Sequence, residues 1–145
     1  MLGIVEKSDF LTEPYEEWFL PEYREYQPDA AILKEIGNKL NAFEIESFIG
    51  SWCGDSKREL PRFIKILEAL DFPAANHKIF ALDEDKKSSE GFESGKDIKR
   101  VPVFILYSNR KESGRIVEYP ATDSLEKDLL SIVNGQPLTP NYSEN

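Results

Sequence analysis

Cysteine and histidine are almost absent from this sequence. Cys53 is the only cysteine and His77 the only histidine among 145 residues. A disulfide within the chain is therefore impossible, and the cytoplasm is the expected compartment. With one residue of each kind, the sequence suggests neither a metal-binding cluster nor a local Cys-His pair. We expect no metal and no bound cofactor, and we expect His77 to be structural or solvated.

Long apolar runs and an excess of positive charge are also missing. No apolar run approaches the roughly 18 residues that a membrane-spanning helix requires. The first ten residues contain Glu6 and Asp9, so no secretory signal peptide is expected there. The chain carries 18 Lys and Arg residues against 27 Asp and Glu residues, a net charge of −9. Such a surface repels phosphates, so we expect neither nucleic acid nor a membrane as a partner.

The chain length and the 40% hydrophobic content suit a single soluble domain with one core. We predict three parts: an acidic and aromatic N-terminal extension over residues 1–27, a domain over residues 28–135, and a loose C-terminal tail over residues 136–145. The extension is expected to form short helical pieces. Its aromatic side chains would either cover the core or form a lip for a partner or substrate.

Hydrophobic periodicity predicts an α/β domain. Helices are expected over about residues 28–41, 55–70 and 124–134, and strands over about residues 43–50, 79–82, 103–107 and 115–119. The first two strands are joined by a crossover helix and must be parallel, whereas the last two form an antiparallel hairpin. The pattern therefore predicts a mixed four-stranded sheet flanked by helices, with residues 83–99 as a charged loop.

Two short motifs occur at the ends of these elements. One is Val101-Pro102, directly before a predicted strand. The other joins a strand to a helix that contains Pro61, and it consists of Trp52, Cys53, Gly54, Asp55 and Ser56. A cysteine at a helix start faces unpaired N–H groups and the positive end of the helix dipole, which favour a thiolate. Most lone cysteines are small buried hydrophobes, but this position favours an exposed, reactive thiol.

The order of elements and these motifs together resemble the thioredoxin superfamily over roughly residues 29–134. The loop looks like a branch of that superfamily that keeps only the first cysteine. The resemblance implies a thioredoxin fold in which a cis peptide bond precedes Pro102 beside the reactive sulfur. It also implies a site in which Cys53 and Ser56 are catalytic and substrate is bound by Trp52, Gly54, Asp55, Val101 and Pro102.

Three departures from the family pattern bear on function. Ser56 stands where the family has its second cysteine, Asp55 replaces the usual proline, and Ser47 occupies the position of a buried acid. Without a second thiol, the intramolecular route of disulfide reduction is impossible. The resemblance instead implies monothiol exchange, in which Cys53 forms a mixed disulfide with a protein or a small molecule. An external thiol such as glutathione would then release it.

The polar residues near Cys53 are expected to have opposite effects on the stability of its thiolate. The hydroxyl and the N–H of Ser56 lie one turn further on, where either could donate to the sulfur. Asp55 opposes a thiolate by repulsion, and Lys57 and Arg58 are expected to offset it.

A second class of function is a redox-inactive thioredoxin-like module whose groove around Trp52 and Pro102 binds a peptide or a protein. Trp52 would then form a wall of the groove, although it could equally be a core residue. A third class, a carrier of a cluster or a thiol cofactor similar to monothiol glutaredoxins, is a poor match to Trp52 and Asp55. Replacing Cys53 by serine separates the first two classes, because exchange would vanish and binding would survive.

Overall fold

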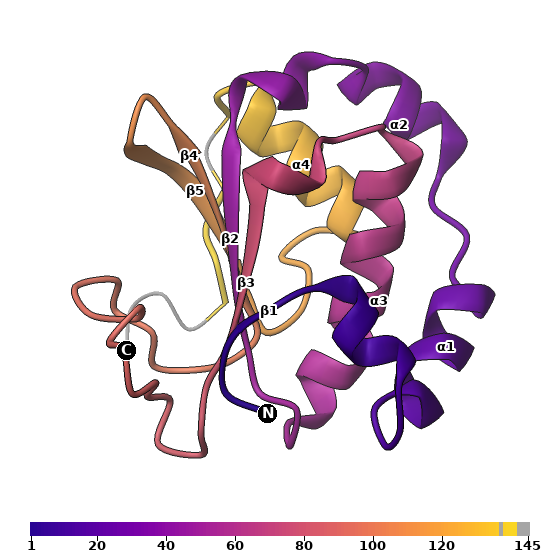
Figure 1. The fold of residues 1–145 in the computed structure, drawn as a ribbon. Coiled ribbons are helices and arrows are strands. Elements are labelled where there is room, and N and C mark those ends of the chain that lie inside the picture. The colour runs from indigo at the N-terminus through magenta and orange to yellow at the C-terminus, as the bar shows by residue number, and fades with distance from the viewer. Residues whose placement is uncertain (137, 142–145) are drawn as a thin grey trace.

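The computed structural model describes residues 1–136 and 138–141 and contains one five-stranded mixed sheet (Figure 1). The strands are β1 (Gly3–Val5), β2 (Glu44–Ile49), β3 (His77–Ala81), β4 (Val103–Ser108) and β5 (Lys111–Val117), in the order β1-β3-β2-β4-β5. The helices are α1 (Glu16–Glu25), α2 (Ala30–Ile36), α3 (Gly54–Ala69) and α4 (Leu125–Val133). Short 3-10 turns η1 (Lys7–Leu11), η2 (Lys39–Ala42) and η3 (Ala74–Asn76) connect them.

The predicted strand directions are confirmed. β2 and β3 are parallel and joined by α3, whereas β4 runs antiparallel to both β2 and β5. Parallel neighbours need a crossover connection, and α3 provides it. Because β2 and β4 are antiparallel neighbours, the end of β2 and the start of β4 lie side by side. The start of α3 follows directly after β2 at the same end of these central strands.

The predicted number of four strands is wrong, because residues 3–5 add a fifth. β1 pairs antiparallel with β3, with Gly3 opposite Ala81 and Val5 opposite Ile79. A three-residue strand shows too little alternation to be recognised in a sequence, and its pairing energy comes from a strand more than 70 positions away. Phe10 and Phe19, which belong to the segment over residues 1–27, are fully buried in the core.

The helix predicted over residues 28–41 is shorter than expected. The carboxylate of Asp29 accepts hydrogen bonds from the N–H groups of Ala31 (2.9 Å) and Ile32 (3.2 Å), which fixes the start of α2. Gly37 has φ +53°, a left-handed conformation that glycine adopts without penalty, and it ends the helix. The remaining residues form the 3-10 turn η2 instead.

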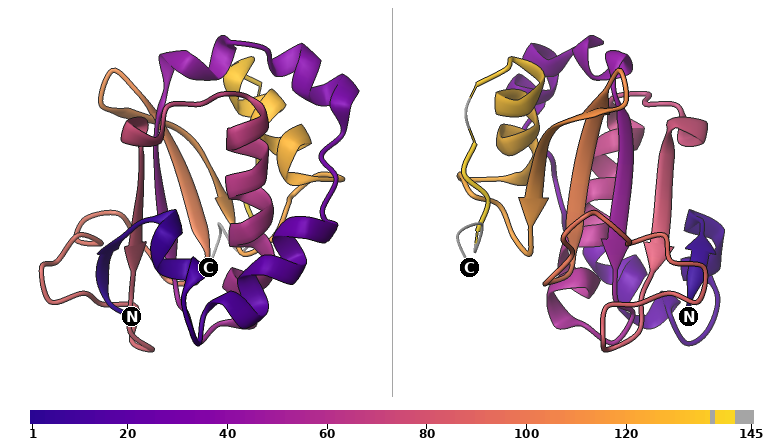
Figure 2. Two further views of the ribbon diagram at one scale, coloured as in Figure 1. Left: turned by 45° about the vertical axis from the view of Figure 1, so that its right-hand side comes forward. Right: turned by 90° about the vertical axis from the view of Figure 1, so that its left-hand side faces the viewer.

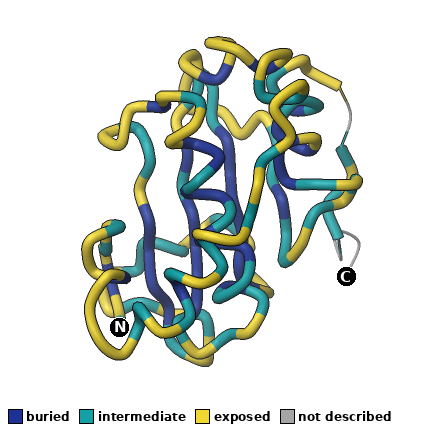
Figure 3. The backbone as a smooth tube through the Cα atoms, turned by 90° about the vertical axis from the view of Figure 1, so that its right-hand side faces the viewer, coloured by how far each residue is buried: buried dark blue, intermediate teal, exposed yellow. Residues whose placement is uncertain are grey.

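All four helices lie on one side of the sheet, with α1 packed on α3 and α2 on α4 (Figures 1 and 2). The larger core cluster fills the space between the sheet and these helices. The loop between β3 and β4 crosses the other side (Figure 2), where Phe92 and Ile98 pack on a smaller cluster that includes Phe48 and Phe80. Buried residues follow the central strands in Figure 3.

The predicted C-terminal tail lies partly outside the described residues. Within the described part, Leu138 packs against the larger core cluster. The side-chain amide of Asn141 donates hydrogen bonds to the carbonyl oxygens of Val117 (3.2 Å) and Tyr119 (2.7 Å). In the part of the chain that the structure describes, no helix combines the length and hydropathy needed to span a membrane.

Candidate functional site

Cys53 is the N-cap residue of α3. Its backbone is extended (φ −97°, ψ 125°), its N–H donates to Gly50 O at 3.0 Å, and its carbonyl accepts from Lys57 N at 3.0 Å. The residue is half-buried rather than enclosed in the core. The sulfur therefore lies at the N-terminal end of a 16-residue helix. This end favours an anion, because the first N–H groups of a helix have no partner within it.

The second motif meets Cys53 across 48 positions of sequence. Sγ of Cys53 lies 3.4 Å from the carbonyl oxygen of Val101 and donates its proton there. The Val101–Pro102 peptide bond is cis, and both residues are buried. The two segments that the resemblance assigns to one site are therefore in direct contact.

Ser56 is buried and serves the turn before α3. Its Oγ accepts a hydrogen bond from Gly50 N at 3.1 Å. Among the described residues, no hydrogen bond joins this hydroxyl to the sulfur of Cys53, so that of the two donors considered for the sulfur the hydroxyl is not used. By accepting from Gly50, the hydroxyl satisfies an N–H group that would otherwise be buried without a partner.

Trp52 is partly a core residue and partly a wall of the groove, the two roles considered for it. Its indole Nε1 donates to Leu82 O at 2.9 Å, and the ring lies against the backbone of Gly50. The side chain is nevertheless 37% exposed, and Lys86 Nζ lies 5.8 Å from the ring centroid. One edge of the indole thus anchors the loop, while the rest offers an apolar surface beside Cys53.

The close packing of Trp52 leads to a prediction for Gly50→Ala. A Cβ at position 50 would lie 2.5 to 2.9 Å from three indole atoms, so the ring must shift, which strains its hydrogen bond to Leu82. We expect the free energy of unfolding to fall by about 1–3 kcal/mol and the fluorescence of Trp52 to change in a Trp18→Phe background.

Gly54→Ala is the matched control, because a Cβ there meets no atom within 4 Å. Position 54 lies in the first turn of α3, where alanine is a better helix former than glycine. Urea denaturation of both variants checks the prediction. If Gly50→Ala were as stable as Gly54→Ala, the indole would not lie where the structure has it.

A carboxyl that sequence reasoning missed lies close to this loop. The N–H of Glu118 donates to Pro102 O at 2.7 Å, and its carboxyl approaches the side chain of Asp55 closely enough for a hydrogen bond. Glu118 adopts φ +67°, which is uncommon for a residue with a side chain. It belongs to no sequence motif, and only the position of β5 beside β4 brings it here.

Charge around the loop is balanced by two arginines. Arg58 forms an ion pair with Asp55 at 2.7 Å, as expected for a residue that offsets the negative charge of Asp55. Arg100 Nε lies 3.6 Å from Glu118 Oε1. Burial raises the pKa of the Glu118 carboxyl, and the hydrogen bond to Asp55 and the repulsion between the two groups add to this effect, while Arg100 opposes it. Glu118 is therefore a weaker acid than an exposed glutamate.

Ser47, at the position of the family's buried acid, pairs with the only histidine. Ser47 Oγ lies 2.7 Å from His77 Nε2, and both side chains belong to adjacent parallel strands. The His77 ring also meets Phe63 edge-on at 5.7 Å between centroids. Burial lowers the pKa of His77 from 6.5 to about 4, so the ring is neutral near pH 7.

The strand order, the crossover helix and the two contacting loops define the class of proteins with a thioredoxin fold. A protein-family model described as Thioredoxin matches residues 6–124, and the chain belongs to this thioredoxin-like family. The predicted fold class is thereby confirmed.

Solved structures show similarity at low sequence identity. A crystal structure of an HIV epitope scaffold is 11% identical, covers 90% of this chain and 82% of its own, and has a TM-score of 0.59. Mitochondrial thioredoxin 3 of Saccharomyces cerevisiae is 23% identical over 59% of this chain and 76% of its own, with a TM-score of 0.39. Thioredoxin f2 of Chlamydomonas reinhardtii is 20% identical over 68% of this chain and 83% of its own, with a TM-score of 0.45. Curated proteins give no match to this chain.

Proposed function

We propose that this protein is a monothiol thiol–disulfide exchange protein that acts through Cys53. The observation that carries the proposal is the position of Cys53, a half-buried residue at the N-terminus of α3. A helix N-terminus favours the thiolate, which is the nucleophile in exchange. Partial exposure gives a disulfide a path to the sulfur.

The exchange has two balanced steps. The Cys53 thiolate attacks one sulfur of a disulfide, a new bond forms between Cys53 and that sulfur, and the other sulfur leaves as a thiolate. An external thiolate then attacks the mixed disulfide, regenerates the Cys53 thiolate and forms a new external disulfide. Ser56 has no sulfur to perform the second step, and its hydroxyl is engaged with Gly50. Glutathione, or another low-molecular-weight thiol, is the proposed external reagent, and the cytoplasm the proposed location.

The substrate would lie along the loops that border the sulfur. Trp52 offers a partly exposed apolar ring, and Gly54 leaves open space beside its backbone. Pro102 has no N–H group, so a substrate chain meets no misplaced donor there. Asp55 and Val101 complete the proposed binding residues, and the proposed partners are thiols and disulfides of proteins or small molecules.

The test is to incubate the folded protein with glutathione disulfide and to weigh the product by mass spectrometry. We expect one glutathionyl group on the native protein, none on Cys53→Ser, and complete removal by excess reduced glutathione. Modification that occurs only after denaturation would contradict the proposal, because the thiol would then be inaccessible in the fold.

The second candidate function is a redox-inactive binding module. It is favoured by the hydrogen bond from Sγ to Val101 O, because only the protonated thiol can donate it. A partner of this kind would be captured equally by native protein and by Cys53→Ser. A mixed disulfide that survives non-reducing electrophoresis and vanishes in Cys53→Ser would instead favour exchange.

A further inference from the structure

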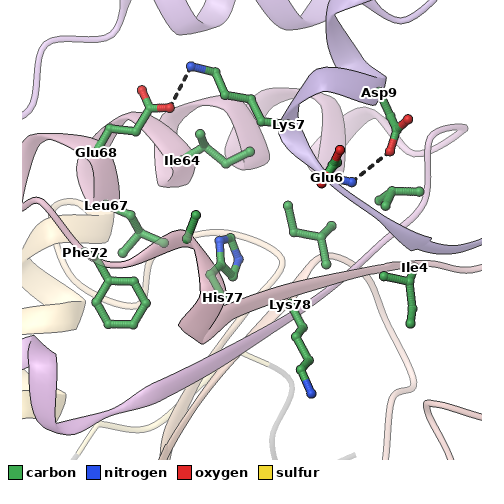
Figure 4. Close-up of a pocket in the computed structure, with 13 residues that line it drawn as sticks. Ile4, Glu6, Lys7, Asp9, Ile64, Leu67, Glu68, Phe72, His77 and Lys78 are labelled. Carbon is green, nitrogen blue, oxygen red and sulfur yellow. Dashed lines mark hydrogen bonds and ion pairs between the residues drawn. The ribbon is translucent and has the colours of Figure 1, made fainter.

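A cavity of about 440 Å³ opens between β1, η1, the second half of α3 and the start of β3 (Figure 4). None of its lining residues belongs to the Cys53 site. Most of the wall is apolar, formed by Val5, Ile64, Leu67, Phe72 and Ile79. The volume lies within the roughly 300–1,000 Å³ that is typical of small-molecule sites.

His77 places one neutral polar group on this apolar wall. In Figure 4 its imidazole lies among the lining side chains, between Leu67 and the segment that carries Glu6. Nε2 is engaged with Ser47, so Nδ1 is the ring nitrogen left to meet a ligand, and the residue is only half-buried. Because burial lowers the pKa of the ring to about 4, Nδ1 is part of an uncharged imidazole at neutral pH.

The charged residues at the rim are mostly acidic, and the one ion pair among them in the described part of the chain joins Lys7 to Glu68. Lys7 Nζ donates to Glu68 at 2.6 Å and to Tyr23 at 3.3 Å. The carboxylate of Asp9 accepts from the backbone N–H of Glu6 at 2.9 Å, and Lys78 points away from the cavity in Figure 4. An anionic ligand would lose its hydration and meet the carboxylates of Glu6, Asp9 and Glu68. The apolar wall and this acidic rim therefore favour a neutral molecule over an anion.

We propose that this cavity binds a small uncharged amphipathic molecule, an apolar ring or chain that carries one hydroxyl group hydrogen-bonded to His77. A hydroxyl both donates and accepts, so it fits the imidazole in either tautomer. The apolar body removes the surrounding side chains from water and supplies most of the binding free energy. This site is independent of the thiol chemistry proposed for Cys53.

Three probes of one shape test the ligand chemistry by isothermal titration calorimetry at pH 7: 1-naphthol, naphthalene and 1-naphthoate. We expect 1-naphthol to bind about three- to tenfold more tightly than naphthalene, the value of one net hydrogen bond. Naphthoate, which is anionic, should bind more weakly than either. Equal affinities for 1-naphthol and naphthalene, or the tightest binding by naphthoate, would overturn the assignment.

Two neighbouring alanines of η3 locate the binding. Both are exposed, but Ala74 lines the cavity whereas Ala75 does not. Ala74→Trp should fill the cavity and abolish binding of 1-naphthol, and Ala75→Trp should leave it unchanged. Binding that persists in Ala74→Trp, or that is absent from the native protein up to millimolar concentration, rejects the proposal. Cys53→Ser should bind 1-naphthol like the native protein, which keeps this result separate from the thiol chemistry.

Discussion

Replacing Phe19 by alanine is expected to lower the free energy of unfolding by about 3–5 kcal/mol. Phe19 lies on α1 and is fully buried, stacked on Phe10 at 5.5 Å and on Tyr23 at 5.8 Å between ring centroids. Removal of its ring leaves a cavity where α1 meets α3, in the largest core cluster. Urea denaturation followed by circular dichroism measures the loss.

Leu2→Ala is the control in the same segment, because Leu2 is 57% exposed and should change the stability by no more than about 0.5 kcal/mol. The comparison also tests the predicted division at residue 27. If Phe19→Ala were as harmless as Leu2→Ala, residues 1–27 would be an extension outside the cooperative unit. A large difference would make them part of the folded domain.

Acidification from pH 7 to pH 4 is expected to remove about 3 kcal/mol of stability through His77 alone. In the unfolded chain this histidine has its ordinary pKa of 6.5, whereas burial lowers it to about 4 in the folded protein. Below pH 6.5 the unfolded state therefore binds a proton that the folded state does not. The contribution is fully present above pH 6.5 and is lost as the pH falls toward 4.

The buried Glu59 and the half-buried Glu118 have the opposite effect on the pH dependence of stability. Burial raises the pKa of Glu59 and of Glu118, so protonation of these groups favours the folded state as the pH falls. The total pH dependence therefore does not isolate His77, and a variant is required.

The double variant Ser47→Ala/His77→Phe isolates the histidine. It removes the titrating ring and the hydroxyl that would otherwise remain buried without its partner. Urea denaturation at pH 7 and at pH 4 should show a smaller loss in this variant than in the native protein, by about 3 kcal/mol. Equal losses in the two proteins would mean that the folded state does not depress the pKa of His77.

The single cysteine makes a dithiol mechanism impossible whatever the fold, and that conclusion needs only the sequence. The segments whose structure was predicted best have strong local signals. The apolar spacing in α3 repeats with the helical period, and β2 and β4 combine β-branched and aromatic residues. These signals arise from neighbours within a turn of helix or along one strand, so they are visible in the sequence. The motif around Cys53 and the Val101-Pro102 pair could also be recognised in the sequence, because each consists of adjacent residues.

Only the tertiary structure decided the contacts between distant segments. β1 exists because β3 offers it an edge, Ser47 meets His77 because β2 and β3 are parallel, and Glu118 reaches Asp55 because β5 lies beside β4. The cavity likewise needs η1, α3 and β3 at once. No local sequence pattern identifies the partner of any of these residues. The energy of each contact depends on segments that are distant in the sequence and adjacent only in the fold.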